Sequence, residues 1–189
     1  MTTATLPIRY EITNTAATAS ASVLKQICST VLSEGGYEKK VAPQVARMTA
    51  TTTVGTSFEP LVTMRLASDR TDAVVLLNKY SATTIGNSLY EIALIRNATL
   101  TGANYDTTTF SSVDIDTSAT ALSGGTVMRS EYVKGTNQAA TQLDINGSYN
   151  FGLQLGRTIA GNSDTFTISA RVTSGSADVV GTMEFYDIT

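Results

Sequence analysis

The chain has 189 residues, a formal net charge of -3 and no histidine. Its 32 Thr and 18 Ser make up about a quarter of the residues, whereas charged residues make up only 15%. Because histidine is absent and Cys28 is the single cysteine, the composition excludes histidine-based catalytic sites, cysteine zinc clusters and internal disulfides. We therefore expect no enzymatic activity, no metal and no other cofactor.

The charge and hydropathy patterns also exclude two classes of partner. Phosphate binding needs clustered basic residues, but the 13 Lys and Arg are spread along the chain. The longest apolar stretch, residues 73–77, is far shorter than the roughly 20 residues of a transmembrane helix. Residues 1–4 lack the basic and apolar regions of a signal peptide. We expect neither a nucleic acid nor a membrane as partner.

The N-terminal part combines a strand signal with an ambiguous segment. Strand character begins at Leu6, so residues 1–6 are interpreted as a candidate N-terminal arm. Residues 22–34 carry apolar side chains at helical spacing and are followed by Gly35, a common helix stop. The same residues are rich in β-branched and hydroxyl side chains, which favour a strand. A strand is the favoured interpretation and a short helix the alternative, and Cys28 is expected to be a small buried side chain.

The middle of the chain contains one segment with no polar face. Residues 62–66 and 90–94 alternate apolar and polar side chains, as in strands with one buried face. Between them lie four consecutive apolar residues, Val74, Val75, Leu76 and Leu77. Such a strand is typically covered on both sides. We predict that these four residues lie in the core or at a contact between subunits.

Asp114 and Asp116 form the strongest candidate for a metal site. A spacing of two puts both carboxylates on one face of a strand, and Asp106 or Asp144 could join them as oxygen ligands of calcium. The segment lacks the remaining ligands and the closing Glu of a calcium loop. A solvated strand edge is therefore the favoured interpretation, and no metal ligand is assigned.

The clearest strand signal lies near the C-terminus. In residues 164–173 the side chains alternate with a period of two, which predicts a strand with one face in the core and the other in water. The core set is Phe166, Ile168, Ala170 and Val172, and the water-facing set is Thr165, Thr167, Ser169 and Arg171. Residues 174–177 have the composition of a turn, and residues 178–188 return as a second strand. We predict a β-hairpin.

The chain as a whole predicts an all-β fold. Further strands are expected at residues 126–134 and 149–155, which gives about nine or ten short strands separated by turn residues. This spacing is typical of an antiparallel β-sandwich, most simply a jelly roll. We expect residues 1–189 to form a single sandwich domain.

Three groups of residues stand out together. The first is Leu-Pro-Ile-Arg-Tyr-Glu-Ile at 6–12, Thr-Ala-Ser-Ala-Ser at 18–22 and residues 24–37. The second is Leu-Thr-Gly-Ala at 100–103 with residues 116–127, and the third is residues 163–171 with 179–185. These stretches, which cover most of the chain in order, resemble structural proteins of bacteriophages, in particular of marine tailed phages. None of them is the signature of a site.

The resemblance implies a virion component without catalytic residues. It implies a decoration or cement protein on the phage head surface, made in the bacterial cytoplasm, which binds the major capsid protein and its own copies. A homotrimer is the expected assembly. The alternative is a fibre or tail module that recognises a bacterial surface glycan. Because relatives often carry a further β region before the segment at 6–12, the chain is either a short member or the C-terminal part of a longer gene product.

Overall fold

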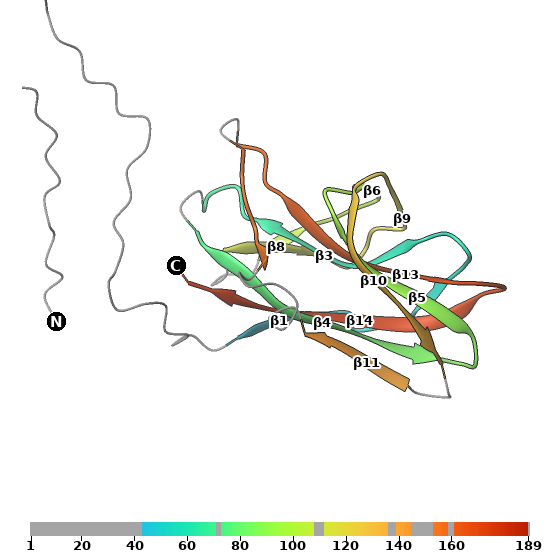
Figure 1. Ribbon diagram of the computed structural model, residues 1–189. Helices are drawn as coiled ribbons and strands as arrows, with labels where there is room; N and C mark the ends of the chain where they lie inside the picture. Colours follow the sequence, from blue (N-terminus) through green and yellow to red (C-terminus); the bar gives the residue numbers. More distant parts are fainter. Residues whose placement is uncertain are drawn as a thin grey trace, which may run out of the picture. The chain divides into compact units, whose positions relative to one another are not determined.

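The computed structural model describes residues 43–70, 73–107, 112–135, 139–144, 153–158 and 161–188. The expectations for residues 1–6, for the strand or helix at 22–34 and for Cys28 lie outside these ranges, as do residues 149–152 of the expected strand at 149–155. The described part contains β-strands and no helix (Figure 1). The all-β prediction is therefore confirmed, while the prediction of a single domain over residues 1–189 stays a prediction.

The strands form two packed antiparallel sheets and one small two-stranded sheet. The first sheet has the order β1 (Gln44–Arg47), β14 (Ala177–Asp187), β4 (Val75–Ile85) and β11 (Ala139–Asp144), with β2 (Thr52–Val54) also beside β14 and β12 (Leu153–Gln154) beside β4. The second has the order β10 (Thr126–Lys134), β5 (Leu89–Arg96), β13 (Thr165–Val172), β3 (Glu59–Leu66), β8 (Val113–Asp116) and β7 (Asp106–Thr107). The small sheet pairs β6 (Thr99–Thr101) with β9 (Ala121–Ser123).

The strand order is that of a jelly roll. The chain passes from the first sheet to the second between β2 and β3, returns with β4, and changes sheet again before β5. Strands β10 and β11, and then β13 and β14, also lie in opposite sheets. The predicted sandwich is confirmed, but the prediction of nine or ten strands is too low, because the described residues contain fourteen. The extra strands are short pieces of two or three residues at sheet edges or in the small sheet.

The predicted C-terminal hairpin is wrong. Strand β13 pairs with β3 and β5 in the second sheet, whereas β14 pairs with β4, β1 and β2 in the first. Residues 173–176 therefore connect the two sheets. The turn residues specify a reversal of the chain, but not whether the two strands share hydrogen bonds. Each strand has one apolar face, and the two faces meet across the core when the strands stack instead of pairing.

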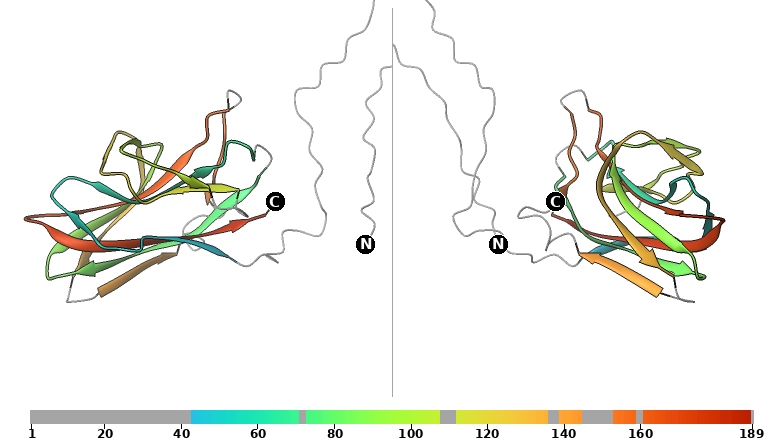
Figure 2. Two further views of the ribbon diagram at one scale, coloured as in Figure 1. Left: turned by 180° about the vertical axis from the view of Figure 1, so that it is seen from behind. Right: turned by 45° about the vertical axis from the view of Figure 1, so that its right-hand side comes forward.

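The main core fills the space between the two layers, which Figure 2 shows from two further directions. The largest fully buried side chains include Tyr80 and Phe185 from the first sheet and Tyr90, Phe166 and Ile168 from the second. The core set predicted for residues 164–173 is confirmed, because Phe166, Ile168, Ala170 and Val172 all belong to this cluster. Val179 and Met183 of β14 lie opposite them in the same cluster.

The water-facing set predicted for the same strand is only partly correct. Thr167 and Ser169 are fully buried, and the Thr167 hydroxyl lies 3.0 Å from the hydroxyl of Thr63 on β3. Ala93 and Ile95 on β5 are buried as well, although neither belongs to the main core. The small sheet explains this burial: β9 lies close to β3, Gly125 after β9 contacts Ile95, and Figure 1 shows β6 and β9 on the outer side of the second sheet.

One end of the sandwich, at the right in Figure 1, gathers several of the connections that pass between the sheets. We call it the arch end and define it as residues 55–58, 86–88, 173–176 and Gly135. Main-chain hydrogen bonds join these connections to neighbouring strands: Val172 N–H to Gly55 O, Thr173 N–H to Leu89 O and Gly135 N–H to Ser88 O, at 2.8 to 3.0 Å. The buried Tyr90 hydroxyl lies 2.8 Å from the Ile85 carbonyl oxygen and 3.1 Å from the Asp178 carbonyl oxygen, and the two carbonyls share its single proton.

Among the described residues, no helix is long and apolar enough to cross a membrane.

Candidate functional site

The four residues predicted as a core or subunit contact divide between two environments. Val75 and Leu77 on β4 are completely buried in the main core. Val74 precedes the strand and is 37% exposed, and Leu76 is partly buried on the outer side of the first sheet. The described residues thus show an alternating strand and not one covered on both sides. A subunit contact through Val74 and Leu76 stays a prediction.

Asp114 and Asp116 do not form a solvated strand edge, because both are buried. Asp114 accepts a hydrogen bond from Arg65 Nε at 3.1 Å. Asp116 accepts from the main-chain N–H groups of Asn104, Ser118 and Ala119 and from the Ser118 hydroxyl, at 2.6 to 3.2 Å. These contacts hold the loop after β8 and residue 104, and they join β8 to β3, so the carboxylates serve the fold. Within the described ranges, no group of three or more acidic or cysteine side chains is placed to hold a metal ion.

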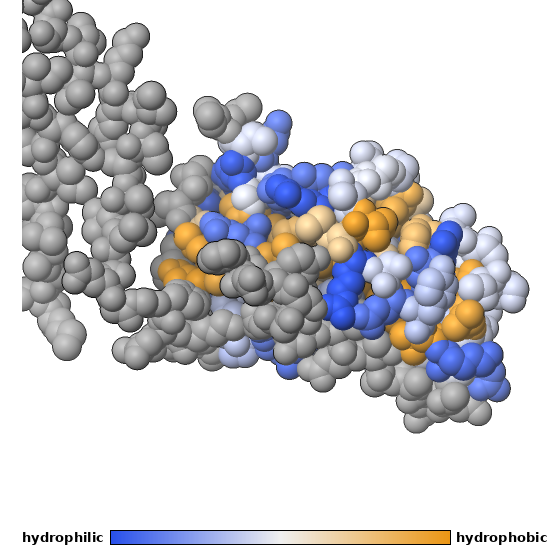
Figure 3. All heavy atoms as spheres, viewed as in Figure 1, coloured by the Kyte–Doolittle hydropathy of each residue, from blue (hydrophilic) through white to orange (hydrophobic). Residues whose placement is uncertain are grey.

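The first candidate site lies on the outer face of the second sheet, near one edge. We call Phe58, Glu91, Ser130, Tyr132 and Arg171 the Arg171 patch. Strand pairing places Tyr132, Glu91 and Arg171 side by side across β10, β5 and β13. Tyr132 is 60% exposed, and the guanidinium of Arg171 lies 4.5 Å from the ring centre of Phe58. Figure 3 shows exposed hydrophobic and polar residues side by side on the viewed face of the sandwich.

The centre of the Arg171 patch is a nearly buried carboxylate. Glu91 is 7% exposed, and its oxygens accept hydrogen bonds from Arg171 Nε and from the Ser130 hydroxyl, each at 2.8 Å. Burial by itself raises the pKa of Glu91, but the hydrogen bonds from Ser130, Arg171 and Tyr132 outweigh it and hold the pKa below its ordinary value of 4.5. The same pairing raises the pKa of Arg171. The arginine is therefore held in one orientation at the surface.

Acid is expected to weaken this arrangement. Because the pKa of Glu91 is lower in the folded chain than its ordinary value of 4.5, the unfolded chain binds more protons at low pH. The contribution of ionised Glu91 to stability is complete at pH values above its ordinary pKa. It is lost as the pH falls through the pKa that Glu91 has in the folded chain. Urea unfolding across this pH range should show a smaller acid-dependent loss in Glu91→Gln than in the parent. Equal losses in the two proteins would contradict the assignment.

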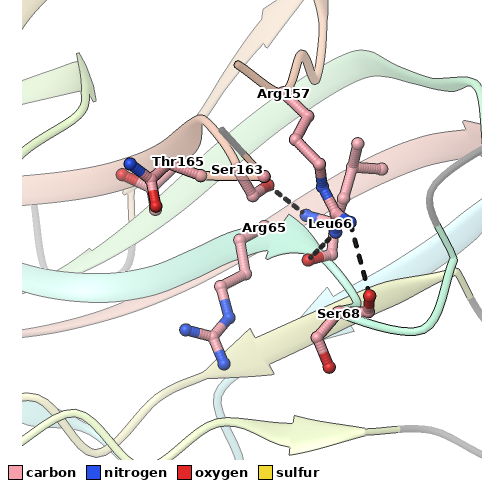
Figure 4. A pocket seen from close by; sticks show the side chains of 8 residues that line it. Arg65, Leu66, Ser68, Arg157, Ser163 and Thr165 are labelled. Carbon is pink, nitrogen blue, oxygen red and sulfur yellow. Dashed lines mark hydrogen bonds between the residues drawn. The ribbon is translucent and has the colours of Figure 1, made fainter. Parts of the chain in front are cut away.

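The second candidate site is a hollow of about 300 Å³ beside the end of β3, which we call the Arg157 hollow. Figure 4 shows its main side chains, which come from β3, from the bridge between Arg157 and Ser163, and from the start of β13. Its lining residues are Arg65, Leu66, Ser68, Arg157, Gly161, Asn162, Ser163 and Thr165. None of them is acidic.

Main-chain contacts fix the position of Arg157. Its Nη2 donates to the carbonyls of Ala67 at 2.6 Å and Leu66 at 3.5 Å, and its Nη1 donates to that of Ser68 at 3.3 Å. On the other wall, the Ser163 hydroxyl accepts from the Leu66 N–H at 2.8 Å. These bonds join residues about 90 positions apart in the chain, and they hold the walls of the hollow together.

A second hollow of about 530 Å³ adjoins the first and shares Asn162, Ser163 and Thr165 with it. Asp164 also lines this second hollow, and its carboxylate accepts hydrogen bonds from Arg96 Nη2 at 2.7 Å and Asn97 Nδ2 at 2.8 Å. Burial raises the pKa of Asp164, but these two hydrogen bonds outweigh it and the pKa lies below the ordinary value. The carboxylate is therefore already paired, and among the residues that line the two hollows Arg157 is the arginine without a carboxylate partner in the described part of the chain.

Sequence reasoning did not identify either site. The sequence did contain a signal for Arg171: it occupies a water-facing position of an alternating strand, which predicts an exposed charged side chain. For Arg157 the sequence has no signal, since its partners on and after β3 are distant in the chain.

The two sites offer different chemistry. Exposed aromatic and arginine side chains on a sheet face are typical of protein contacts. A concave site with a few fixed polar groups is typical of a small ligand. Comparison with protein-family models, curated proteins and solved structures finds no match to this chain.

Proposed function

We propose that the chain is a virion structural protein, namely a decoration protein that binds the outer surface of a phage head and stabilises the shell. Its partners are the major capsid protein and further copies of the chain, with a homotrimer as the expected assembly. The sequence resemblance in the stretches 6–12, 18–22, 24–37, 100–103, 116–127, 163–171 and 179–185 supports this proposal. So does the jelly-roll sandwich, which presents rigid sheet faces without requiring any catalytic group.

The Arg171 patch is the observation that carries the contact function. Tyr132 supplies a large exposed aromatic surface, and Arg171 is held by Glu91 and Phe58 before any partner arrives. Tyr and Arg are enriched among the residues that dominate binding energy at protein interfaces. Because Arg171 is already ordered, binding costs less side-chain entropy than it would with a free arginine. We therefore place the shell contact at this patch.

Binding of the purified chain to heads that lack it tests the proposal. Tyr132→Ser should weaken binding by about 30-fold, the effect of removing an interface hot spot of about 2 kcal/mol. The matched control is Val45→Ser, which removes a similarly exposed apolar side chain, 57% exposed, from the first sheet. Co-sedimentation with heads measures both variants. Equal binding by Tyr132→Ser and the parent would contradict the proposed contact.

A second candidate function is a fibre or tail module that binds a bacterial surface glycan. The two adjoining polar hollows favour it, since together they offer hydroxyl and amide groups to more than one hydroxylated unit. Electron cryomicroscopy of the particle separates the two functions. Many copies over the head support decoration, and a few copies at the tail support adhesion.

A further inference from the structure

The Arg157 hollow has an unbalanced positive charge. Its lining includes two arginines and no carboxylate. Arg65 is paired, because its Nε lies 3.1 Å from Asp114 Oδ2 and its guanidinium stacks 3.8 Å from the ring centre of Tyr105. Figure 4 shows the Arg65 guanidinium directed away from Arg157. Arg157 contacts neutral main-chain carbonyls and makes no ion pair within the described part of the chain.

Two polar atoms of the lining residues lack hydrogen-bond partners. Arg157 Nε and Thr165 Oγ1 are both buried, and neither has a partner among the described residues. Buried polar atoms almost always find a protein or water partner. Both atoms belong to residues that line the hollow, so a polar ligand can pair with them once a side-chain adjustment exposes them.

The cationic group is also fixed in position. A guanidinium has five N–H groups, and three carbonyls of residues 66–68 accept from Nη1 and Nη2 of Arg157, which leaves Nε–H and one N–H of Nη1. The carbonyl contacts order the side chain without cancelling its charge. Because the Arg157 side chain is already ordered in the fold, an anion that binds in the hollow causes little further loss of side-chain entropy.

We propose that the Arg157 hollow binds the carboxylate of an acidic sugar unit, such as a uronic acid of a polysaccharide. Arg157 supplies the charge complement, and Thr165 and Asn162 contact the sugar hydroxyls. The adjoining hollow, with Thr158 and Thr99 in its lining, takes the next sugar unit. This activity goes beyond shell decoration and holds whether the chain lies on the head or at the tail.

The size and lining of the hollow favour a sugar acid over a bare inorganic anion. A volume of about 300 Å³ lies at the lower end of the range for ligand sites, which exceeds what sulfate or phosphate needs. The unpaired cation is single, which matches one carboxylate. The hydroxyl and amide groups of Ser68, Asn162 and Thr165 both donate and accept hydrogen bonds, which matches the hydroxyls of a sugar ring, whereas sulfate offers acceptors only.

Titration of the full chain with glucuronate, followed by NMR chemical shifts, tests the proposal. Glucose differs from glucuronate by the absence of the carboxylate, and sodium sulfate supplies an anion without a sugar. Glucuronate should shift the amides of residues 157–165, and glucose and sulfate should each bind at least tenfold more weakly. Equal binding of glucose or sulfate, or no binding of glucuronate, would overturn the proposal.

Three variants identify the site. Arg157→Gln should weaken glucuronate binding by at least tenfold while leaving glucose binding unchanged. Because Arg157 also holds the loop after β3, Thr165→Val provides a variant that retains these carbonyl contacts, and it should weaken glucuronate binding severalfold. Lys134→Gln removes a cation from the exposed end of β10 and should bind as the parent does. If Lys134→Gln weakens binding as much as Arg157→Gln does, the hollow is not the site.

Discussion

Replacing Tyr90 by alanine is expected to lower the free energy of unfolding by about 3–5 kcal/mol, the usual cost of deleting a large buried aromatic side chain. Tyr90 is completely buried and packs in the main core. Its hydroxyl bonds the last residue of β4 to Asp178 of β14, which links two adjacent strands to the arch end. Urea unfolding followed by fluorescence or circular dichroism measures the change.

Tyr90→Phe separates the hydroxyl from the ring. It retains the packing and removes both hydrogen bonds, leaving the Ile85 and Asp178 carbonyls without this donor. We expect a loss of about 1–3 kcal/mol, the cost of leaving a buried polar group unpaired. If Tyr90→Phe is as stable as the parent, the hydroxyl does not hold the arch end together.

Gly135→Ala is the second change with a large expected effect. A Cβ at this position would lie 2.4 Å from the Gly86 carbonyl oxygen and 2.9 Å from Tyr90 Cε2. The closest atom is main chain, so it cannot move aside as a flexible side chain would. Strain of this kind typically costs about 1–3 kcal/mol, and here the contact with backbone places the expected loss at the upper end. The urea midpoint should fall accordingly.

Gly55→Ala is the matched control for Gly135→Ala. Gly55 also belongs to the arch end, but the nearest atom to its Cβ position is Glu59 Oε1 at 3.7 Å, an ordinary contact. Alanine at this position should leave stability within about 0.5 kcal/mol of the parent, or raise it slightly by restricting the unfolded chain. Similar losses in both variants would show that the arch end is sensitive to any side chain, and the proposed clash would be wrong.

The fold class could be predicted because it depends on local pattern. Alternation in residues 164–173 correctly identified Phe166, Ile168, Ala170 and Val172 as core residues, since side-chain direction in a strand has a period of two. Which strands become neighbours depends on the whole chain. The composition of residues 174–177 is compatible both with a hairpin and with a connection between sheets. Here β14 pairs with β1, β2 and β4, all of which precede it by many residues.

The errors about solvent exposure have a related cause. Thr167 and Ser169 are polar, so their face of β13 was expected in water, but both are buried, and β6 and β9 lie over part of the second sheet. Asp114 and Asp116 were expected at a solvated edge, but Arg65 and the N–H groups of the following loop surround them. The strands β6 and β9 lie far from β13 in the chain. The loop after β8 is close to Asp116 in the chain, but the side-chain pattern does not specify the direction in which it leaves the strand.

The two candidate sites could not be predicted from the sequence for the same reason. Arg157 gains its role from three carbonyls that lie about 90 residues earlier in the chain. Arg171 gains its role from Glu91, which precedes it by 80 residues. Neither pair has a characteristic spacing, because the connection between them consists of complete strands and not of a local motif.

The central place of β14 in the first sheet affects how the chain is made. During synthesis β1, β2 and β4 leave the ribosome long before β14, and none of them has its shared partner until then. The first sheet therefore cannot be completed until residues 177–187 have been translated. In the second sheet, β3 and β5 likewise cannot be joined before β13 has been translated. Pairings of such sequence separation make folding slow, on a scale of about milliseconds to seconds. Nascent chains thus expose unpaired strand edges, which makes them candidates for chaperone binding before the sandwich is complete.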